Sequence, residues 1–494
     1  MEPQHHSSID YAGNPGATYA FPLTFAQRRL WFLDQLAPGQ TSYLIPWAVR
    51  IRGLLDVEAL ASSLSQIAER HEVFRTTFIE IEGEPSQLVS PATRIPVPLV
   101  DLSQLSLPDA EKEAKRLTRI EAETPIDLSI GPILRAKLLV LAPGDYVLLL
   151  TTHHIVFDGW SRSILVRELG IFYQAFRSGT SAQIPELPIQ YADFAVWQQE
   201  HLQDEQLDRQ LSFWKRQLHD LPLSIELPTD RRRPAVQTYN GASFHFDLPP
   251  ALSQQVKAVS RQQGVTPYMT LLAVFQALIS RYTGQEDIPI GAPTANRNRP
   301  ELEGIIGLFA NTLVFRTQLS GDPTFHELLT RVKETALSAY ANEEMPFEQL
   351  VQELRPERSL SHSPLFQILF SLRNTPSGSF QLADLQVEFF LGSGETSKYD
   401  LSMYLEERPG GFRGKLEYNT DLYDATTIER LQRHYQTLLE SALKAPDTQL
   451  SKLQMLDAAE RTQLLVEWNN TARDYPRNQC LHQVFEDQVK HRPD

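Results

Sequence analysis

Residues 145–161 read Asp-Tyr-Val-Leu-Leu-Leu-Thr-Thr-His-His-Ile-Val-Phe-Asp-Gly-Trp-Ser, and this stretch decides the fold. Its first part, Asp145 to Thr152, is a continuous β-prone run of strand length, which predicts a buried sheet strand. From Ser161 to Phe176 the apolar residues follow helical spacing. The run His153-His154-x-x-x-Asp158-Gly159 therefore lies where a buried strand passes through a loop into a helix, a common place for catalytic groups.

This HHxxxDG run combines a base, a carboxylate and a flexible backbone position at short range. Histidine is suited to proton transfer near neutral pH. Successive side chains of a strand point to opposite faces, so His153 and His154 cannot both face one substrate channel. Asp158 could orient a histidine or pair with an arginine, and Gly159 permits a tight bend and close approach of a substrate carbonyl. The alternative is that both histidines are buried, hydrogen-bonded structural residues.

Two other chemistries fit the motif less well. His154 and Asp158 could share a helical face as metal ligands, but the preceding apolar run indicates a strand end, and no other His/Cys cluster has zinc spacing. No Gly-x-Ser-x-Gly elbow of a serine hydrolase occurs in the sequence. We therefore expect no metal in this site.

The bulk composition is that of an ordinary globular chain longer than one compact core usually holds. It has 494 residues, 41% hydrophobic and 22% charged, with a net charge of -15. The negative charge disfavours nucleic acid and anionic membrane as partners. A single cysteine, Cys480, and the lack of a long apolar run or secretory signal predict a cytoplasmic location and no membrane span.

Helical and strand patterns alternate along the chain. Helical spacing is found over Thr24–Leu36, Val57–Arg70 and Thr266–Tyr282, and a strand pattern over Ser243–Leu248. A polar, proline-marked connection covers residues 177–190. These patterns predict an α/β (α+β) fold in two lobes. The basic run Arg231 to Arg233 fits a solvated turn better than a phosphate site.

The residues from about Leu23 to about Leu453 resemble the condensation domains of nonribosomal peptide synthetases, enzymes of secondary metabolite biosynthesis. Seven segments match the family signatures in order: Thr24–Leu33, Arg70–Phe78, His153–Ser161, Tyr191–Trp197, Ile306–Thr312, Asn342–Glu348 and Arg355–Leu365. Phe157, Ala310 and the Asn342-Glu-Glu-Met opening depart from the usual pattern, which bears on substrate preference. The segment from Cys480 resembles the opening of an adenylation domain.

The resemblance implies two chloramphenicol-acetyltransferase-like lobes in a V-shaped pseudo-dimer, with the active site in a tunnel between them. We expect a flexible leader at residues 1–20, an N-terminal lobe at 21–180, a C-terminal lobe at 181–455, a linker at 456–478 and the start of an adenylation domain at 479–494.

The implied reaction is that of an amide-forming acyltransferase, in which an acceptor amine attacks a donor thioester. His154 matches the second histidine of the family motif and is assigned the proton-handling or positioning role. His153, Asp158 and Gly159 are expected to support the motif, and Arg75 to pair with Asp158. No cofactor-binding residues are assigned, and no cofactor is expected to be covalently bound.

The implied partners are an acceptor peptidyl carrier protein bearing phosphopantetheine, a donor, and a downstream adenylation domain; the domain is expected to be monomeric. Because Met1 lies about 20 residues before the first signature, we expect the donor to arrive in trans. The short leader favours starter N-acylation from acyl-CoA, as in lipopeptide initiation, whereas the signatures resemble the elongating subtype fed by a carrier protein. An epimerising relative, or a non-catalytic platform that recruits carriers or enzymes, remain alternatives.

Overall fold

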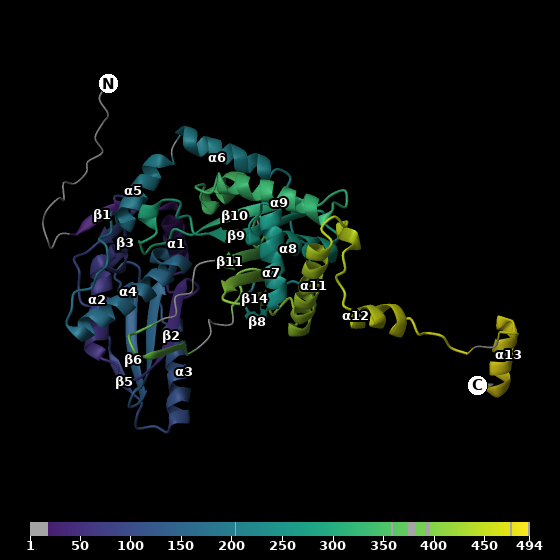
Figure 1. Ribbon diagram of the computed structural model, residues 1–494, viewed down its shortest axis with the longest axis horizontal. Helices are drawn as coiled ribbons and strands as arrows, with labels where there is room; N and C mark the ends of the chain where they lie inside the picture. Colours follow the sequence, from purple (N-terminus) through teal and green to yellow (C-terminus); the bar gives the residue numbers. More distant parts are fainter. Residues whose placement is uncertain are drawn as a thin grey trace.

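The protein is described by a computed structural model, which covers residues 18–202, 204–356, 359–373, 381–390, 396–474 and 477–492. Two lobes of mixed sheet and helix lie side by side, with the first half of the chain in one and most of the second half in the other (Figure 1). The predicted α/β (α+β) class is confirmed. Most of the expected leader lies outside the described residues.

The N-terminal lobe is built on a five-stranded sheet with the order β12-β2-β7-β6-β5. Its strands are β2 (Leu44–Arg52), β5 (Leu99–Asp101), β6 (Leu134–Ala142), β7 (Asp145–His153) and β12 (Gln386–Phe389). The predicted buried strand is β7, whose residues from Val147 to His153 are all buried. It lies at the centre of the sheet, between β2 and β6, and this placement explains why its sequence is apolar without alternation.

Helices and a second, smaller sheet complete this lobe. Helix α2 (Val57–Arg70) has the predicted bounds, and α4 (Gly159–Ser178), which packs on it, begins two residues before the predicted start. The remaining elements are α1 (Phe25–Leu36), α3 (Leu107–Glu123), α5 (Tyr191–His201) and the sheet of β1 (Tyr19–Pro22), β3 (Thr76–Ile81) and β4 (Glu84–Val89).

The C-terminal lobe has a six-stranded sheet with the order β10-β9-β11-β13-β14-β8. The strands are β8 (Gly241–Asp247), β9 (Asp287–Thr294), β10 (Asn311–Gln318), β11 (Ile368–Arg373), β13 (Leu401–Arg408) and β14 (Gly411–Asn419). The helices are α6 (Asp204–Gln217), α7 (Pro250–Gln262), α8 (Pro267–Thr283), α9 (Phe325–Tyr340), α10 (Phe347–Leu354) and α11 (Ala425–Lys444). Helix α8 matches its predicted bounds to one residue, with Thr266 as the N-cap.

Two segments of the second half of the chain cross to the N-terminal lobe. Strand β12 pairs antiparallel with β2, so it extends the sheet of that lobe. The segment 295–310 between β9 and β10, here called the bridge, buries apolar side chains in the core of the N-terminal lobe, among them Ile306 and Phe309. The lobes are therefore interlocked, a feature that the expected division at residues 180/181 did not include.

Helix α12 (Ala458–Thr462) contacts α11, with Glu460 Oε2 lying 2.9 Å from His434 Nε2, whereas α13 (Leu481–His491) extends away from both lobes (Figure 1). The linker and the start of an adenylation domain stay predictions for these residues. Within the described ranges, no helix is long and apolar enough to cross a membrane.

Candidate active site

His153 ends β7 and is a buried, internally bonded residue. Its Nδ1 accepts a hydrogen bond from the Ile155 backbone N–H at 3.1 Å, and the residue is 3% exposed. Burial, together with the neighbouring His154, lowers the pKa of His153 to about 4. A neutral ring whose Nδ1 accepts a backbone bond shapes the turn after the strand.

His154 begins the 3-10 turn His154–Val156 that follows β7. Its backbone N–H donates to the carbonyl of Tyr43 at 2.8 Å, which fixes the start of the turn against the segment before β2. The residue is partly exposed, but its Nδ1 is buried and has no hydrogen-bond partner in the described part of the chain. Burial first, and then the charge of Lys398, lower the pKa of His154 to about 4, while Asp158 opposes the shift. The imidazole is thus neutral at physiological pH and can accept a proton.

Asp158 is the N-cap of α4 and the centre of a hydrogen-bond cluster. Its Oδ1 accepts from the Ser161 N–H at 2.8 Å and the Ser161 hydroxyl at 2.7 Å. Its Oδ2 accepts from the backbone N–H groups of Phe309 and Ala310 in the bridge, at 3.0 and 3.2 Å. Both carboxylate oxygens of Asp158 accept hydrogen bonds from protein groups, so Asp158 joins the helix to the bridge.

The predicted pairing of Asp158 with Arg75 is wrong. Arg75 pairs instead with Glu72 at 3.1 Å and donates to the Ser90 carbonyl. The partner of Asp158 is Arg297 in the bridge, whose Nη2 lies 3.3 Å from Oδ1, with both side chains 1% exposed. The expected ion pair exists, but its cation comes from across the lobe boundary. The sequence spacing does not show that Arg297, rather than Arg299, is the partner of Asp158.

Arg297 makes several contacts within the bridge. It donates to the carbonyls of Leu302 and Ile305, and its guanidinium lies 4.1 Å from the centre of the Phe309 ring. Burial lowers its pKa, and Asp158 opposes that shift. The pair is therefore a fully desolvated contact between the lobes.

Gly159 is the first residue of α4 and is exposed. A Cβ built there would meet no heavy atom within 4 Å. The backbone is not in a conformation that requires glycine. The open space is compatible with close approach of a substrate.

Several signature segments meet around this motif as scaffold. The Tyr191 hydroxyl donates to the Leu308 carbonyl at 2.7 Å, and Ser161 exchanges hydrogen bonds with the backbone of Gly307. Asn311 donates to the carbonyls of Glu343 and Met345 at 2.8 and 2.7 Å. The ordered motifs of the sequence thus converge in space at the junction of the lobes.

The basic run is largely solvated, as predicted, with Arg231 and Arg232 exposed, and two of its arginines also form ion pairs. Arg233 pairs with the buried Asp400, and Arg231 pairs with Asp424. Neither points to a phosphate site.

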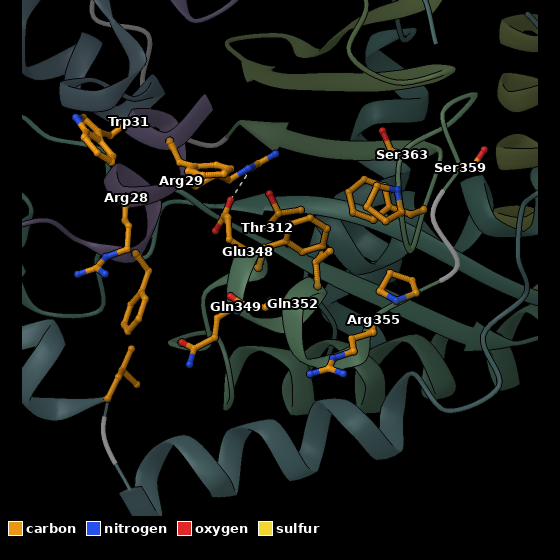
Figure 2. Close-up of a pocket in the computed structure, with 18 of the residues that line it drawn as sticks. Arg28, Arg29, Trp31, Thr312, Glu348, Gln349, Gln352, Arg355, Ser359 and Ser363 are labelled. Carbon is orange, nitrogen blue, oxygen red and sulfur yellow. Dashed lines mark hydrogen bonds and ion pairs between the residues drawn. The ribbon is translucent and has the colours of Figure 1, made fainter. Parts of the chain in front are cut away.

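A cavity of about 1810 Å³ lies between α1 and α10 (Figure 2). Arg28, Arg29 and Trp31 line it from the N-terminal lobe, and Gln352 and Arg355 line it from the C-terminal lobe.

An ion pair spans this cavity: Arg29 Nη1 lies 2.7 Å from Glu348 Oε1. Tyr399, the neighbour of Lys398 in the chain, also lines the cavity. Lys398 Nζ in turn lies 5.4 Å from the centre of the Tyr43 ring.

Among the described residues, no group of three or more His, Cys, Asp or Glu side chains could hold a metal ion. The arrangement can bind an extended substrate, exclude water and accept a proton at one neutral imidazole.

These features define the class of two-lobed, chloramphenicol-acetyltransferase-like proteins. Within that class, the family model described as "Condensation domain" matches residues 18–465, and the chain belongs to the condensation-domain family of nonribosomal peptide synthetases.

Curated relatives agree with this assignment. Subunits B and C of linear gramicidin synthase from Brevibacillus parabrevis are each 47% identical over 94% of this chain, which spans 9% and 6% of their lengths. Phosphinothricin tripeptide synthetase PhsC from Streptomyces viridochromogenes is 41% identical over 96% of this chain, which spans 44% of it. The chain thus corresponds to one part of each of these synthetases.

Solved structures have the same fold. The X-domain from teicoplanin biosynthesis is 29% identical with a TM-score of 0.78, covering 88% of this chain and 97% of that one. A four-domain nonribosomal peptide synthetase bound to AMP and glycine has a TM-score of 0.82 at 20% identity, covering 98% of this chain and 38% of that one.

Proposed function

We propose that this chain forms an amide by letting the amine of a carrier-bound aminoacyl acceptor attack a donor acyl thioester beside His154. The observation that carries the proposal is a neutral His154 imidazole at the junction of two lobes, which together also line a cavity larger than the 300–1,000 Å³ typical of small-ligand sites. A cavity of this size suits a long flexible arm such as phosphopantetheine.

In the proposed step, the amine nitrogen attacks the thioester carbon, so that a C–N bond forms and the C–S bond breaks. The amine nitrogen loses one proton to the His154 ring, which can return it to the departing sulfur as a thiol. The two lobes hold amine and carbonyl together and exclude water, which supplies most of the acceleration. His153, Asp158 and Gly159 support this geometry without handling the proton.

The donor distinguishes two versions of this function. One version is starter acylation from acyl-CoA, and the other is elongation. The 47% identity to two subunits of a peptide synthetase favours elongation with a donor on a carrier protein. Purified protein is offered a loaded acceptor carrier together with either acyl-CoA or an acyl-carrier donor, and mass spectrometry identifies the amide. Amide made only from acyl-CoA indicates starter acylation, and amide made only from the acyl-carrier donor indicates elongation.

His154→Ala tests the residue. We expect amide formation to fall by roughly 10²–10⁴-fold, the usual contribution of a proton-transferring side chain. His245→Ala, which removes an exposed histidine of β8, is the matched control and keeps full activity. Undiminished product from His154→Ala would overturn the role of His154.

A binding platform is the second candidate function. It is favoured by the similarity to the teicoplanin X-domain, which has also been solved in a complex with OxyB. A platform makes no amide from either donor, so the same assay separates the two functions. The proposal also includes that the domain is cytoplasmic and monomeric and works with carrier proteins and an adenylation domain.

A further inference from the structure

Arg162, in the first turn of α4, lies over two aromatic rings of the N-terminal sheet. Its guanidinium is 4.9 Å from the centre of the Trp47 ring and 4.6 Å from that of Phe389. Trp47 belongs to β2, and Phe389 belongs to β12, the strand that crosses from the second half of the chain. Phe389 pairs with Val49, two residues from Trp47, so both rings stand on the same face of the sheet. Rings from two adjacent strands therefore hold the guanidinium in place.

The N–H groups of this guanidinium have no acceptor in the described part of the chain. No carboxylate oxygen there lies within 4.0 Å of it, and no protein oxygen accepts a hydrogen bond from it. The Arg162 side chain is partly exposed and Phe389 is 57% exposed, so a dissolved ligand can reach the guanidinium. An arginine whose stem is packed and whose donors lack a partner is pre-organised to bind an anion in a planar, bidentate manner.

The charges around Arg162 also favour an anion. Burial and then Arg373, at the end of β11, lower the pKa of Arg162, while Glu406 of β13 opposes the shift. Glu406 itself pairs with Arg408 at 2.6 Å. In addition, the dipole of α4 disfavours a cation and favours an anion at this end of the helix. A bound anion would offset each of these unfavourable contributions.

Trp47 connects this place with the catalytic motif. Its ring packs edge-on against Phe157 of the HHxxxDG run, with 5.6 Å between the ring centres. Along β2, Trp47 lies three residues, about 10 Å, from Leu44, which pairs with His153. This spacing suits a long flexible arm with one end at Arg162 and the other end at the histidines.

We propose that Arg162 binds the phosphate group of a phosphopantetheine arm, over Trp47 and Phe389, while the thioester end of the arm reaches the histidines. The inference deepens the proposed amide-forming function and rests on it. Two parallel N–H···O bonds from the guanidinium to phosphate oxygens are the expected contact. A phosphate at this position of the arm is common to carrier proteins and to coenzyme A, so Arg162 recognises chemistry that both sources share.

Binding of two small probes tests the contact without any reaction. Phosphopantetheine and pantetheine differ only in the phosphate, and isothermal titration calorimetry measures the Kd of each. We expect the unmodified chain to bind the phosphorylated probe about tenfold more tightly, the lower end of what a hydrogen bond to a charged group contributes. The preference should disappear in Arg162→Met, whose unbranched side chain still covers the two rings, and persist in part in Arg162→Lys.

Arg167→Met is the matched control, because Arg167 lies on the same helix and its Nη2 is 3.7 Å from Glu168 Oε1. It should keep the preference for the phosphorylated probe. Equal affinities of the unmodified chain for the two probes would overturn the proposal, as would a preference that Arg162→Met retains. A preference lost equally in Arg167→Met would also contradict it, because general positive charge would then be responsible.

Single-turnover amide formation identifies the source of the arm. The donor and the acceptor are offered in turn as thioesters of pantetheine or of phosphopantetheine, and the concentration that gives half the maximal rate is measured. A lower concentration for the phosphorylated form, seen on one side only and lost in Arg162→Met, assigns the site to the donor or to the acceptor. An effect on neither side, or an equal effect on both, contradicts the binding of one phosphate by Arg162.

The two donor sources are separated in the same assay. If the site belongs to the donor, Arg162→Met should raise the half-maximal concentration of whichever donor the protein uses, acyl-CoA or an acyl-carrier protein. An unchanged value for that donor would overturn the assignment. If the unmodified protein makes no amide, the proposed function fails, while the calorimetry still decides the role of Arg162.

Discussion

The two lobes are joined by two ion pairs of the same chemical type in opposite surroundings. Asp158 and Arg297 are each 1% exposed and are enclosed by backbone donors and carbonyls. Arg29 and Glu348 are 47% and 24% exposed and line the large cavity. The buried pair joins the start of α4 to the bridge, and the open pair lies in the wall of the cavity. The access of water to an ion pair between the lobes thus determines how much stability is lost when the pair is broken.

The largest effect is expected from breaking the buried pair. Asp158→Ala leaves the Arg297 charge buried and unpaired, which should lower the free energy of unfolding by about 3–5 kcal/mol, measured by urea denaturation. Arg75→Met is the control, because Arg75 pairs elsewhere and is 19% exposed. An equal loss from Arg75→Met would show that the buried Asp158–Arg297 pair has no special effect on the free energy of unfolding.

The bridge that carries Arg297 should also resist a change in packing. A Cβ at Gly307 would lie 2.0 Å from Cδ2 of Tyr191, so Gly307→Ala must displace a fully buried ring. We expect a loss of roughly 1–3 kcal/mol in the free energy of unfolding. Gly304→Ala in the same bridge meets its first neighbour at 3.5 Å and should cost less. Equal losses would show that the bridge is not tightly packed against Tyr191.

The open pair should contribute little. Glu348→Gln is expected to change the free energy of unfolding by about 0.2–1 kcal/mol, because water screens the partly exposed charges. The difference should shrink in 1 M salt, where the screening length is about 3 Å. A loss as large as that of Asp158→Ala, or one insensitive to salt, would remove the distinction between the two pairs.

The smallest effect on stability is expected at Gly159, the residue after Asp158. Gly159→Ala meets open space and should leave the thermal midpoint unchanged. If the donor carbonyl approaches this backbone, the added methyl group should still lower the rate of amide formation. Unaltered single-turnover kinetics would remove Gly159 from the substrate path.

Local patterns predicted the elements and the place of the site, but not the contacts between the lobes. The apolar run of β7, the helical spacing of α2 and the Thr266 cap of α8 are encoded within a few residues. The partner of Asp158 lies 139 residues away, in a segment without regular periodicity. Such pairings depend on how whole lobes dock, so Arg297 could not be found from spacing. The alternating patterns predicted an α/β (α+β) fold in two lobes, and the family resemblance added that these lobes are chloramphenicol-acetyltransferase-like.

The crossing of β12 has a consequence for the sheet of the N-terminal lobe. Its residues Gln386 to Phe389 pair with Arg52 to Val49 of β2, so the free backbone N–H and C=O groups of that outer strand are covered by a segment from late in the chain. Without this cover, β2 would present an exposed edge able to pair with the same edge of another molecule. A nascent or truncated chain that ends before residue 386 should therefore self-associate through β2, and the crossing strand protects the folded chain from aggregation.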